Sequence, residues 1–323
     1  MKHVLLPDVK VRPLQFYLAM EEYLAALSAD EDYFFMWQVN PTVIIGRNQH
    51  LVSEVNLDYC RSHLIDIVRR RSGGGCVYAD MNNVMLSYIT TSDAVTTTFG
   101  RYTAMVADVL CRLGIDARAG GRNDIMIGDR KVSGNAFYHR RGRAIVHGTM
   151  LYDTDIDAML RAITPSSRKL TAKGVESVRS RVINLSEVSD ITLPEFKRRA
   201  AEMLCDSTMT LTPDDVERIE ELALNYTKPG WLAGNRTHAA ATSREHIDGV
   251  GELELSVELN GPVIERVGLM GDFFLLSDLD SSLLDRLKGV EYTPAAVTNA
   301  LARVDVSQVI ASLSTSKFIE LLF

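Results

Sequence analysis

The sequence predicts an α+β protein: a mixed, mainly antiparallel sheet with flanking helices, followed by a small α+β C-terminal domain. Stretches with apolar residues at helical spacing are interspersed, in no regular order, with short β-branched and aromatic runs that are typical of strands. Several of these runs are joined by two-residue turn signals, which favour antiparallel pairing. A Gly/Pro interruption at 226–237, YTKPGWLAGNRT, then sets off a tail of roughly 75 residues, within the usual size range of a domain. We therefore predict domains at 1–245 and 246–323.

The individual elements follow from spacing and turn chemistry. Residues 14–27, LQFYLAMEEYLAAL, have apolar side chains at helical spacing. Asn40-Pro41 divides an aromatic and β-branched stretch into two strands, and Asn260-Gly261 is a strong hairpin signal. Thr212 and Pro213 suit an N-cap and a first helical position. In chain order, we predict helices at 14–27, 57–65, 99–114, 194–205 and 214–225, strands at 33–39, 42–46, 123–127, 131–139 and 143–152, and hairpins formed by 76–80 with 84–90 and within 251–270.

Composition excludes several classes of protein. Of 323 residues, 46% are hydrophobic and 24% are charged, as in ordinary globular domains. The net charge of -7 argues against general affinity for nucleic acid. The four cysteines form no Cys-x-x-Cys pair, so we expect reduced thiols and neither disulfides nor a zinc site. No apolar run reaches the roughly 18 residues of a membrane helix, and the first residues lack a signal-peptide pattern, so we expect a cytoplasmic protein without membrane contact.

The stretch RRRSGGGCVYADMNN, 69–83, places three arginines directly before Ser72 and three glycines. Glycines let a ligand approach the backbone, and their N–H groups can surround an anion. An arginine beside such amides suits a phosphate or a carboxylate. The alternative is a glycine-rich turn with a solvated basic edge, and the stretch alone favours neither. The P-loop and dinucleotide-binding patterns are absent from it.

A second group of candidates lies in RNDIMIGDRKVSGNAF, 122–137, and HGTM, 147–150. A lysine at the head of a strand, such as Lys131, is usually a surface residue, and spacing alone favours that interpretation. Otherwise Lys131 delivers a charge to a ligand oxygen between small residues. Asn123-Asp124 suits the binding of a ribose, a metal or an amine, or forms only an Asx turn. A single histidine in an apolar run, such as His147, is more often a core residue than a catalytic one. The basic segment 166–182 either becomes ordered over an anion or is a solvated loop.

Taken together, RRRSGGG, GRNDI, GDRKVSGNAF, HGTML and KGVESVRSRV, in this order and at these separations, closely resemble the lipoate–protein ligase family. The run FFMWQVNPTVIIGRNQH is also similar to the family's opening. The resemblance covers about residues 10–190 and continues more loosely through the tail. It implies a biotin/lipoate ligase-like catalytic domain followed by an accessory domain.

The resemblance implies an enzyme that activates lipoate with ATP, giving lipoyl-AMP and pyrophosphate, and then forms an amide with one lysine of an acceptor. Bringing a carboxylate and a triphosphate together requires fixed positive charge and amide donors, and Mg²⁺ would screen the phosphates. The implied acceptors are apo lipoyl domains of 2-oxoacid dehydrogenase acyltransferase subunits and the glycine-cleavage H protein. We expect the enzyme to act as a monomer.

The family's pattern also implies roles for individual residues. Lys131 is the implied catalytic residue, stabilising charge on the nucleotide phosphate and the lipoyl carbonyl oxygen, and 166–182 resembles the family's adenylate-binding loop. No metal ligands are implied. The implied ATP and adenylate site comprises Arg70, Gly75, Cys76, Val77, Tyr78, Asn83, Asn123, Asp124, Lys131, Thr149 and Arg181. The implied lipoate site comprises Trp37, Arg70, Ser72, Gly73, Gly74, Lys131, Gly134 and His147.

The chain departs from the family's pattern after the glycines, where Ala79 replaces a histidine and Asn82 replaces a glycine. These departures leave open a fold that binds lipoate, adenylate or a lipoyl domain without turnover. A second alternative is an ATP-independent octanoyl or lipoyl transferase with Cys76 as its nucleophile. Biotin–protein ligase is less favoured, because its glycine- and arginine-rich loop pattern is absent.

Overall fold

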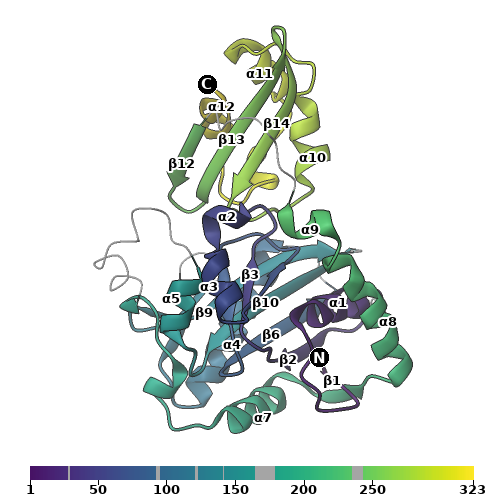
Figure 1. Ribbon diagram of the computed structural model, residues 1–323, viewed down its shortest axis with the longest axis vertical. Coiled ribbons are helices and arrows are strands. Elements are labelled where there is room, and N and C mark those ends of the chain that lie inside the picture. The colour runs from purple at the N-terminus through teal and green to yellow at the C-terminus, as the bar shows by residue number, and fades with distance from the viewer. Residues whose placement is uncertain (28–29, 92–94, 121–122, 141, 164–178, 235–242) are drawn as a thin grey trace. The chain divides into compact units, whose positions relative to one another are not determined.

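The computed structural model describes residues 1–27, 30–91, 95–120, 123–140, 142–163, 179–234 and 243–323. They form two compact units (Figure 1). The first unit consists of Met1–Ile45, Val52–Arg70 and Cys76–Leu232. The second consists of Gly46–Leu51, Arg71–Gly75 and Ala233–Phe323. The C-terminal segment thus forms one unit with two short loops from the first quarter of the chain, while the sequence-based boundary at 245 stays a prediction.

An eight-stranded mixed sheet forms the centre of the first unit, in the order β11-β1-β2-β6-β10-β9-β8-β7. Strand β1 pairs in parallel with β11 and β2, and the other neighbours pair antiparallel. The predicted mixed, mainly antiparallel sheet is therefore confirmed. Its strands are β1 (Lys2–Leu5), β2 (Tyr33–Trp37), β6 (Asn83–Thr90), β7 (Ala117–Gly120), β8 (Asp124–Ile127), β9 (Arg130–Arg140), β10 (Arg143–Leu151) and β11 (Ser207–Thr210).

The predicted hairpin of 76–80 with 84–90 is wrong. Strand β5 (Val77–Ala79) pairs with β3 (Thr42–Ile45) in a small sheet completed by β4 (Asp66–Arg69), whereas β6 pairs with β2 and β10. Every residue of β6 is buried, as expected for a strand with a neighbour on each side. The intervening turn redirects the chain from one sheet to the other: the Asp80 carboxylate accepts the Asn82 N–H at 2.9 Å.

Helices cover the sheet where amphipathic stretches predicted them. Thr212 caps α8 through a capping box with Asp215, and Pro213 is the first helical residue, as predicted. Gly114 follows α4 with a φ of +85°, the left-handed conformation that glycine adopts readily. The helices of the first unit are α1 (Leu14–Ala25), α3 (Leu57–Ser62), α4 (Val95–Arg112), α5 (Ile156–Ala162), α7 (Leu193–Leu204) and α8 (Pro213–Ala223). Two short helices, α2 (Leu51–Glu54) and α9 (Pro229–Ala233), each have residues assigned to both units.

The second unit packs helices against an antiparallel sheet of β12 (Ser243–Ile247), β13 (Gly251–Asn260) and β14 (Val263–Gly271). The predicted turn at Asn260-Gly261 joins β13 and β14, with Gly261 at a φ of +62°. Its helices are α10 (Leu279–Ser282), α11 (Pro294–Ala300) and α12 (Thr315–Leu322). This confirms the expected α+β architecture of the tail.

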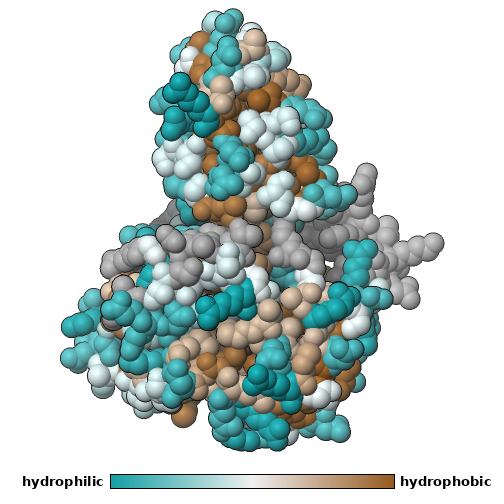
Figure 2. Space-filling model, turned by 180° about the vertical axis from the view of Figure 1, so that it is seen from behind, coloured by the Kyte–Doolittle hydropathy of each residue, from teal (hydrophilic) through white to brown (hydrophobic). Residues whose placement is uncertain are grey.

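Each unit has its own hydrophobic core. In the first, α1 contributes Leu14, Phe16 and Leu18 to a cluster that continues into β2 and α8. In the second, side chains of β13, β14 and α12 meet around Phe273 and Phe318. On the face shown in Figure 2, hydrophilic residues alternate with small hydrophobic patches on both units. No described helix is both long enough and apolar enough to span a membrane.

Candidate functional site

Strands β8, β9 and β10 bring four of the sequence-predicted residues together around Lys131. Gly134 pairs with Asp124 on one side and with Thr149 on the other. The Lys131 Nζ lies 2.7 Å from Asp124 Oδ1, with about a third of each side chain exposed. The lysine also folds over Gly134, because a Cβ built there would lie 2.7 Å from both Cε and Nζ. A partly exposed cation is thus held at a defined place on the sheet.

A bulge explains how Lys131 reaches Gly134. Residues three apart on a regular strand point to opposite faces. The register between β8 and β9 shifts between Ile125 and Met126, so Ser133 and Lys131 face consecutive residues of β8 and one residue of β9 is unpaired. Such an extra residue changes the direction of neighbouring side chains. Apart from the small residues around it, no pattern in the sequence predicts this bulge.

Two further predicted residues are attached to the same strand through the backbone. The Lys131 N–H donates to the Arg181 carbonyl at 2.7 Å, and the Ile183 N–H donates to the Lys131 carbonyl at 2.9 Å. Asn123 donates from Nδ2 to the Asn135 carbonyl at 2.9 Å, and the Asn135 side chain returns a bond to the Asn123 carbonyl at 3.0 Å. The main chain on both sides of Lys131 is therefore fixed. Residues 164–178, which include most of the predicted adenylate-binding loop, lie outside the described residues.

Trp37 and His147, both predicted to border lipoate, meet through a buried polar network. The Trp37 indole N–H donates to Ser87 Oγ at 2.9 Å, and that hydroxyl donates to Glu21 Oε1 at 2.6 Å. His147 Nδ1 lies 2.9 Å from the same carboxylate oxygen, and the Tyr138 hydroxyl donates to Oε2 at 3.3 Å. Glu21 is fully buried, so these donors replace the water that a carboxylate requires. The pairing of β6 with β10 brings these side chains together, since Ser87 lies directly opposite His147.

Sequence reasoning missed Glu21. Its helix, α1, is buried over most of its length, and Glu21 and Glu22 interrupt the apolar side chains near its middle. An acid inside a helix that is apolar on nearly every side requires a buried partner. That signal was present in LQFYLAMEEYLAAL, but it could not name the partner, which comes from a strand 126 residues later.

Arg70 and Cys76 flank the triple-glycine stretch in the first unit. Arg70 is only 4% exposed, follows β4 and donates from Nη1 to the Ile44 carbonyl at 3.0 Å. Burial lowers the pKa of its guanidinium to about 10, so it remains charged at neutral pH. Burial raises the pKa of the Cys76 thiol to about 12, although the positive charge of Arg70 opposes this shift. The thiol is therefore protonated at neutral pH.

Val77 and Tyr78 lie in β5, and Asn83 is the first residue of β6, on either side of the turn between the two strands. Val77 pairs with Ile44, and burial raises the pKa of Tyr78. Asn83 donates from Nδ2 to the Tyr78 carbonyl at 3.3 Å. Ala79, the first departure from the family's pattern, is fully buried in the hydrophobic core. Asn82, the second, does not adopt a left-handed conformation, so glycine's conformational freedom is not needed there.

The glycines themselves lie in the second unit, in contact with its C-terminal segment. The Gly74 N–H donates to the Phe273 carbonyl at 3.2 Å, and Gly74 has a φ of +83°. A Cβ on Gly73 would lie 2.3 Å from the same carbonyl oxygen, whereas a Cβ on Gly75 would meet nothing within 4 Å. The buried Ser72 accepts the Arg47 N–H at its carbonyl, at 2.9 Å. Packing therefore accounts for Gly73 and Gly74 independently of any ligand.

Two further features bear on ligands. Among the described residues, no three His, Cys, Asp or Glu side chains gather in a way that could hold a metal ion. A cavity of about 780 Å³ in the first unit borders Trp37, but it is lined by none of the other sequence-predicted site residues. The predicted convergence of Lys131 with Gly73–Gly75 on one pocket remains a prediction, since the structure describes these residues in separate units.

Comparison with known proteins places these features in a family. Residues 13–205 match the lipoyl protein ligase A/B catalytic domain, and residues 239–322 match the bacterial lipoate protein ligase C-terminus. Lipoate–protein ligase 1 of Staphylococcus aureus is 34% identical over 317 residues, which cover 94% of this chain and 95% of that protein. A bipartite lipoate protein ligase of Thermoplasma acidophilum, solved in a study that includes its E2 lipoyl domain, is 28% identical with a TM-score of 0.66, over 74% of this chain and 98% of that one. A lipoate–protein ligase A bound with ATP is 28% identical with a TM-score of 0.63, over 72% of this chain and 98% of that one. The chain is therefore a member of the lipoyl protein ligase A/B family.

Proposed function

We propose that this protein is a lipoate–protein ligase that uses ATP to form lipoyl-AMP and then transfers the lipoyl group to a lysine of an acceptor protein. The observation that carries the proposal is the similarity, over nearly the whole of both chains, to a relative named as a lipoate–protein ligase. The ATP-bound neighbour supports the use of ATP. The geometry around Lys131 supports the assignment of roles to residues.

In the first step, a carboxylate oxygen of lipoate attacks the α-phosphorus of ATP, and the bond to the bridging oxygen breaks as pyrophosphate leaves. Both reactants are anions, so their approach requires a fixed cation. Lys131 supplies that cation. Asp124 and the strand backbone hold the Lys131 side chain before substrate arrives. Its Nζ lies 2.7 Å from the Asp124 carboxylate, and it has room over Gly134 because glycine has no side chain.

Mg²⁺ is the metal that we expect to accompany ATP. It binds proteins through one or two carboxylates and takes its remaining ligands from phosphates and water, so a multi-residue metal cluster is not required. Asp124 has the appropriate chemistry: its buried Oδ1 faces Lys131 at the proposed phosphate site. Asp124 would hold the ion, which when bound screens the phosphates and stabilises the leaving pyrophosphate. If Asp124 holds the ion, its ion pair with Lys131 would weaken, and the lysine would become available to the substrates.

Lipoate is proposed to lie with its dithiolane end toward Trp37 and His147. The hydrogen bonds between Trp37, Ser87, Glu21 and His147 fix the indole and imidazole rings in place. A wall whose polar atoms already have partners can accept an apolar ring without leaving a donor or acceptor unsatisfied. The network thereby favours the dithiolane over a polar group of similar size.

In the second step, the neutral amine of an acceptor lysine attacks the lipoyl carbonyl, AMP leaves and a proton is released as the amide forms. Lys131 would stabilise the negative charge that develops on the carbonyl oxygen. The archaeal neighbour that was studied with its E2 lipoyl domain supports a lipoyl domain as acceptor. We extend this to the acyltransferase subunits of 2-oxoacid dehydrogenases and the glycine-cleavage H protein, with the ligase acting as a cytoplasmic monomer.

The alternative transferase mechanism requires a reactive thiolate at Cys76. Burial raises the pKa of that thiol to about 12, which leaves very little thiolate at neutral pH. A partly buried thiol with this pKa is a poor nucleophile, which supports the ATP-dependent reaction. The departure from the family's pattern at Ala79 gives little support to a non-catalytic role, because Ala79 packs in the hydrophobic core.

The decisive experiment incubates the protein with lipoate, Mg-ATP and an apo lipoyl domain, and measures the intact mass of the acceptor. We expect the acceptor to gain one lipoyl group, and lipoate-dependent exchange of labelled pyrophosphate into ATP to report the first step. Lys131→Ala should lose both signals, while the exposed Lys228→Ala should retain them. Transfer without ATP, or no exchange by the wild-type protein, would contradict the proposal.

A further inference from the structure

The cavity that borders Trp37 lies toward one edge of the main sheet. Strands β1 and β2 pair at only two positions, Lys2 with Tyr33 and His3 with Phe34. Beyond them the cavity, of about 780 Å³, is lined by residues of β1, β2, α1 and α7. These elements lie at the same end of the first unit (Figure 1). The volume is within the range of about 300–1,000 Å³ that is typical of small-molecule sites.

The inner wall of this cavity is apolar. Val4, Leu6 and Phe35 contribute aliphatic and aromatic surface, beside the stacked rings of Tyr17 and Trp37. The centroids of those two rings are 4.8 Å apart, at an interplanar angle of 11°. Both rings are nearly fully buried, so the apolar surface that a ligand can reach lies on neighbouring lining residues such as Leu5 and Met36.

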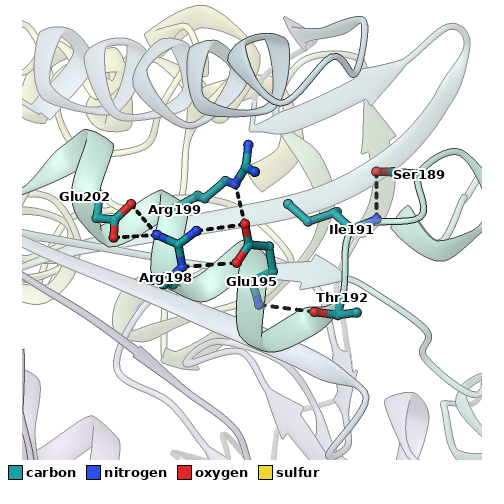
Figure 3. A network of polar contacts seen from close by, with 7 residues as sticks. All are labelled: Ser189, Ile191, Thr192, Glu195, Arg198, Arg199 and Glu202. Atoms are coloured by element: carbon teal, nitrogen blue, oxygen red, sulfur yellow. Dashed lines mark hydrogen bonds and ion pairs between the residues drawn. The ribbon is translucent and has the colours of Figure 1, made fainter.

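The acidic residues around the cavity already have cationic partners. Asp8 accepts two hydrogen bonds from Arg12, the shorter at 2.7 Å, and Asp206 lies 2.9 Å from the N-terminal amino group. On α7, Arg198 is paired with Glu202 at 2.6 Å and also with a second glutamate of the same helix (Figure 3). These charges therefore largely cancel one another.

Lys197 is different, because its side chain has no carboxylate partner among the residues that the structure describes. Its Nζ donates to the neutral Gln38 Oε1 at 3.1 Å. Burial lowers its pKa, which shows that the charge is poorly compensated. The neighbouring His3 adds no positive charge at neutral pH, since burial and Lys197 both lower its pKa. A partly buried ammonium thus faces an apolar cavity without an anion.

We propose that this cavity binds a monocarboxylate with a medium-length apolar body, with the carboxylate on Lys197 and the body along Leu5 and Met36. A partly buried ammonium without a carboxylate partner among the described residues, beside apolar side chains, matches one acid group on an apolar chain. The site is separate from the proposed reaction centre, since neither Lys131 nor His147 lines it. Trp37 lines the cavity and also donates its indole N–H to Ser87, so the two regions share this residue. The proposal holds whether or not the chain ligates lipoate.

The test uses octanoate as the probe and backbone amide shifts of the labelled full-length protein as the readout. We expect saturable shifts at Met36, Ala201 and Ser207, which line the cavity. Uncharged 1-octanol should produce much weaker shifts. Shifts confined to the strand around His147, with the cavity amides unmoved, or equal binding of the alcohol would overturn the proposal.

Substitutions on α7 separate the cavity from general charge effects. Lys197→Gln should weaken octanoate binding at the cavity by about tenfold or more, because a hydrogen bond to a charged group is lost. Arg199→Gln removes a positive charge two residues away, outside the cavity lining, and should leave the affinity unchanged. Ala201→Trp should fill the cavity and abolish these shifts while lipoate-dependent pyrophosphate exchange persists. Equal affinity in the two glutamine variants would refute the role of Lys197.

Discussion

The substitution Gly134→Ala tests most directly whether the position of Lys131 matters. The new Cβ would lie 2.7 Å from the Lys131 Nζ and Cε, closer than non-bonded carbon atoms approach. The lysine must therefore move by an ångström or so, on the order of the deficit from a normal contact of about 3.5–4.0 Å. That movement also disturbs the 2.7 Å ion pair with Asp124. Misplacement of this size in a reacting group costs about 100-fold in rate.

The same substitution should leave the fold almost unchanged. The atoms that obstruct the new methyl group belong to the far end of a flexible side chain, and Gly134 does not have a positive φ. Replacing glycine by alanine at such a position changes the free energy of unfolding by no more than about 1 kcal/mol. We therefore expect pyrophosphate exchange to fall about 100-fold with little change in the midpoint of thermal unfolding.

Two other glycines provide matched controls. Gly100→Ala, on exposed helix surface with nothing within 4 Å of the new Cβ, should affect neither activity nor folding. Gly148→Ala should destabilise the fold, because its Cβ would lie 1.8 Å from Asn135 Oδ1, and that side chain is held by Asn123. In the Lys131→Ala background, Gly134→Ala should cost nothing further. Full activity in the Gly134→Ala single variant would refute the proposed placement of the ammonium.

Four further outcomes are expected. Lys131→Ala should abolish most adenylation in the pyrophosphate exchange assay while its circular dichroism spectrum and unfolding midpoint stay near wild type; an active variant would remove the lysine from the mechanism. Cys76→Ser should retain ligation by intact mass, and complete loss would favour the transferase. Glu21→Gln removes the charge that accepts three buried hydrogen bonds, so denaturant unfolding should show a loss of about 1–3 kcal/mol, and an unchanged midpoint would show that the network is dispensable. Two arginines lower the pKa of Glu195 from 4.5 to about 2; since the depressed pKa belongs to the folded state, its stabilisation is present above pH 4.5 and lost as the pH falls toward 2, so Glu195→Gln should lower the unfolding midpoint at pH 7 and not at pH 2.

Much of the fold could be predicted because it follows from local signals. Apolar periodicity located the long helices, and turn chemistry located Asn260-Gly261 and the cap at Thr212. The hairpin of 76–80 with 84–90 failed for a non-local reason. Two strands three residues apart in sequence usually pair, but β6 is fully buried between β2 and β10, and β5 pairs with β3 instead. The short connection therefore predicted a hairpin of 76–80 with 84–90, but the burial of β6 between two other strands determines the actual pairing.

The site was predictable where chemistry and sequence neighbourhood coincide. Lys131, Asp124 and Gly134 occur within eleven residues, and a single antiparallel ladder brings them into contact. Glu21 could not be assigned in this way, because its role depends on Ser87 and His147, which approach it only when two strands and a helix are assembled. Individual functional residues are thus visible in the sequence, whereas the partners that fix their geometry are not.

The triple glycine shows how one sequence feature can serve two physical demands. Its bare backbone suggested close approach by a ligand, and the structure gives a second reason for two of the three residues. Gly73 has no room for a Cβ against the Phe273 carbonyl, and Gly74 adopts a left-handed conformation and donates to that same oxygen. Gly75 is the glycine whose Cβ would meet nothing. If the loop also binds substrate, Gly75→Ala should impair ligation without loss of stability, because only a bound ligand occupies the space that its methyl group would enter. Gly73→Ala should instead destabilise the second unit even when no substrate is present.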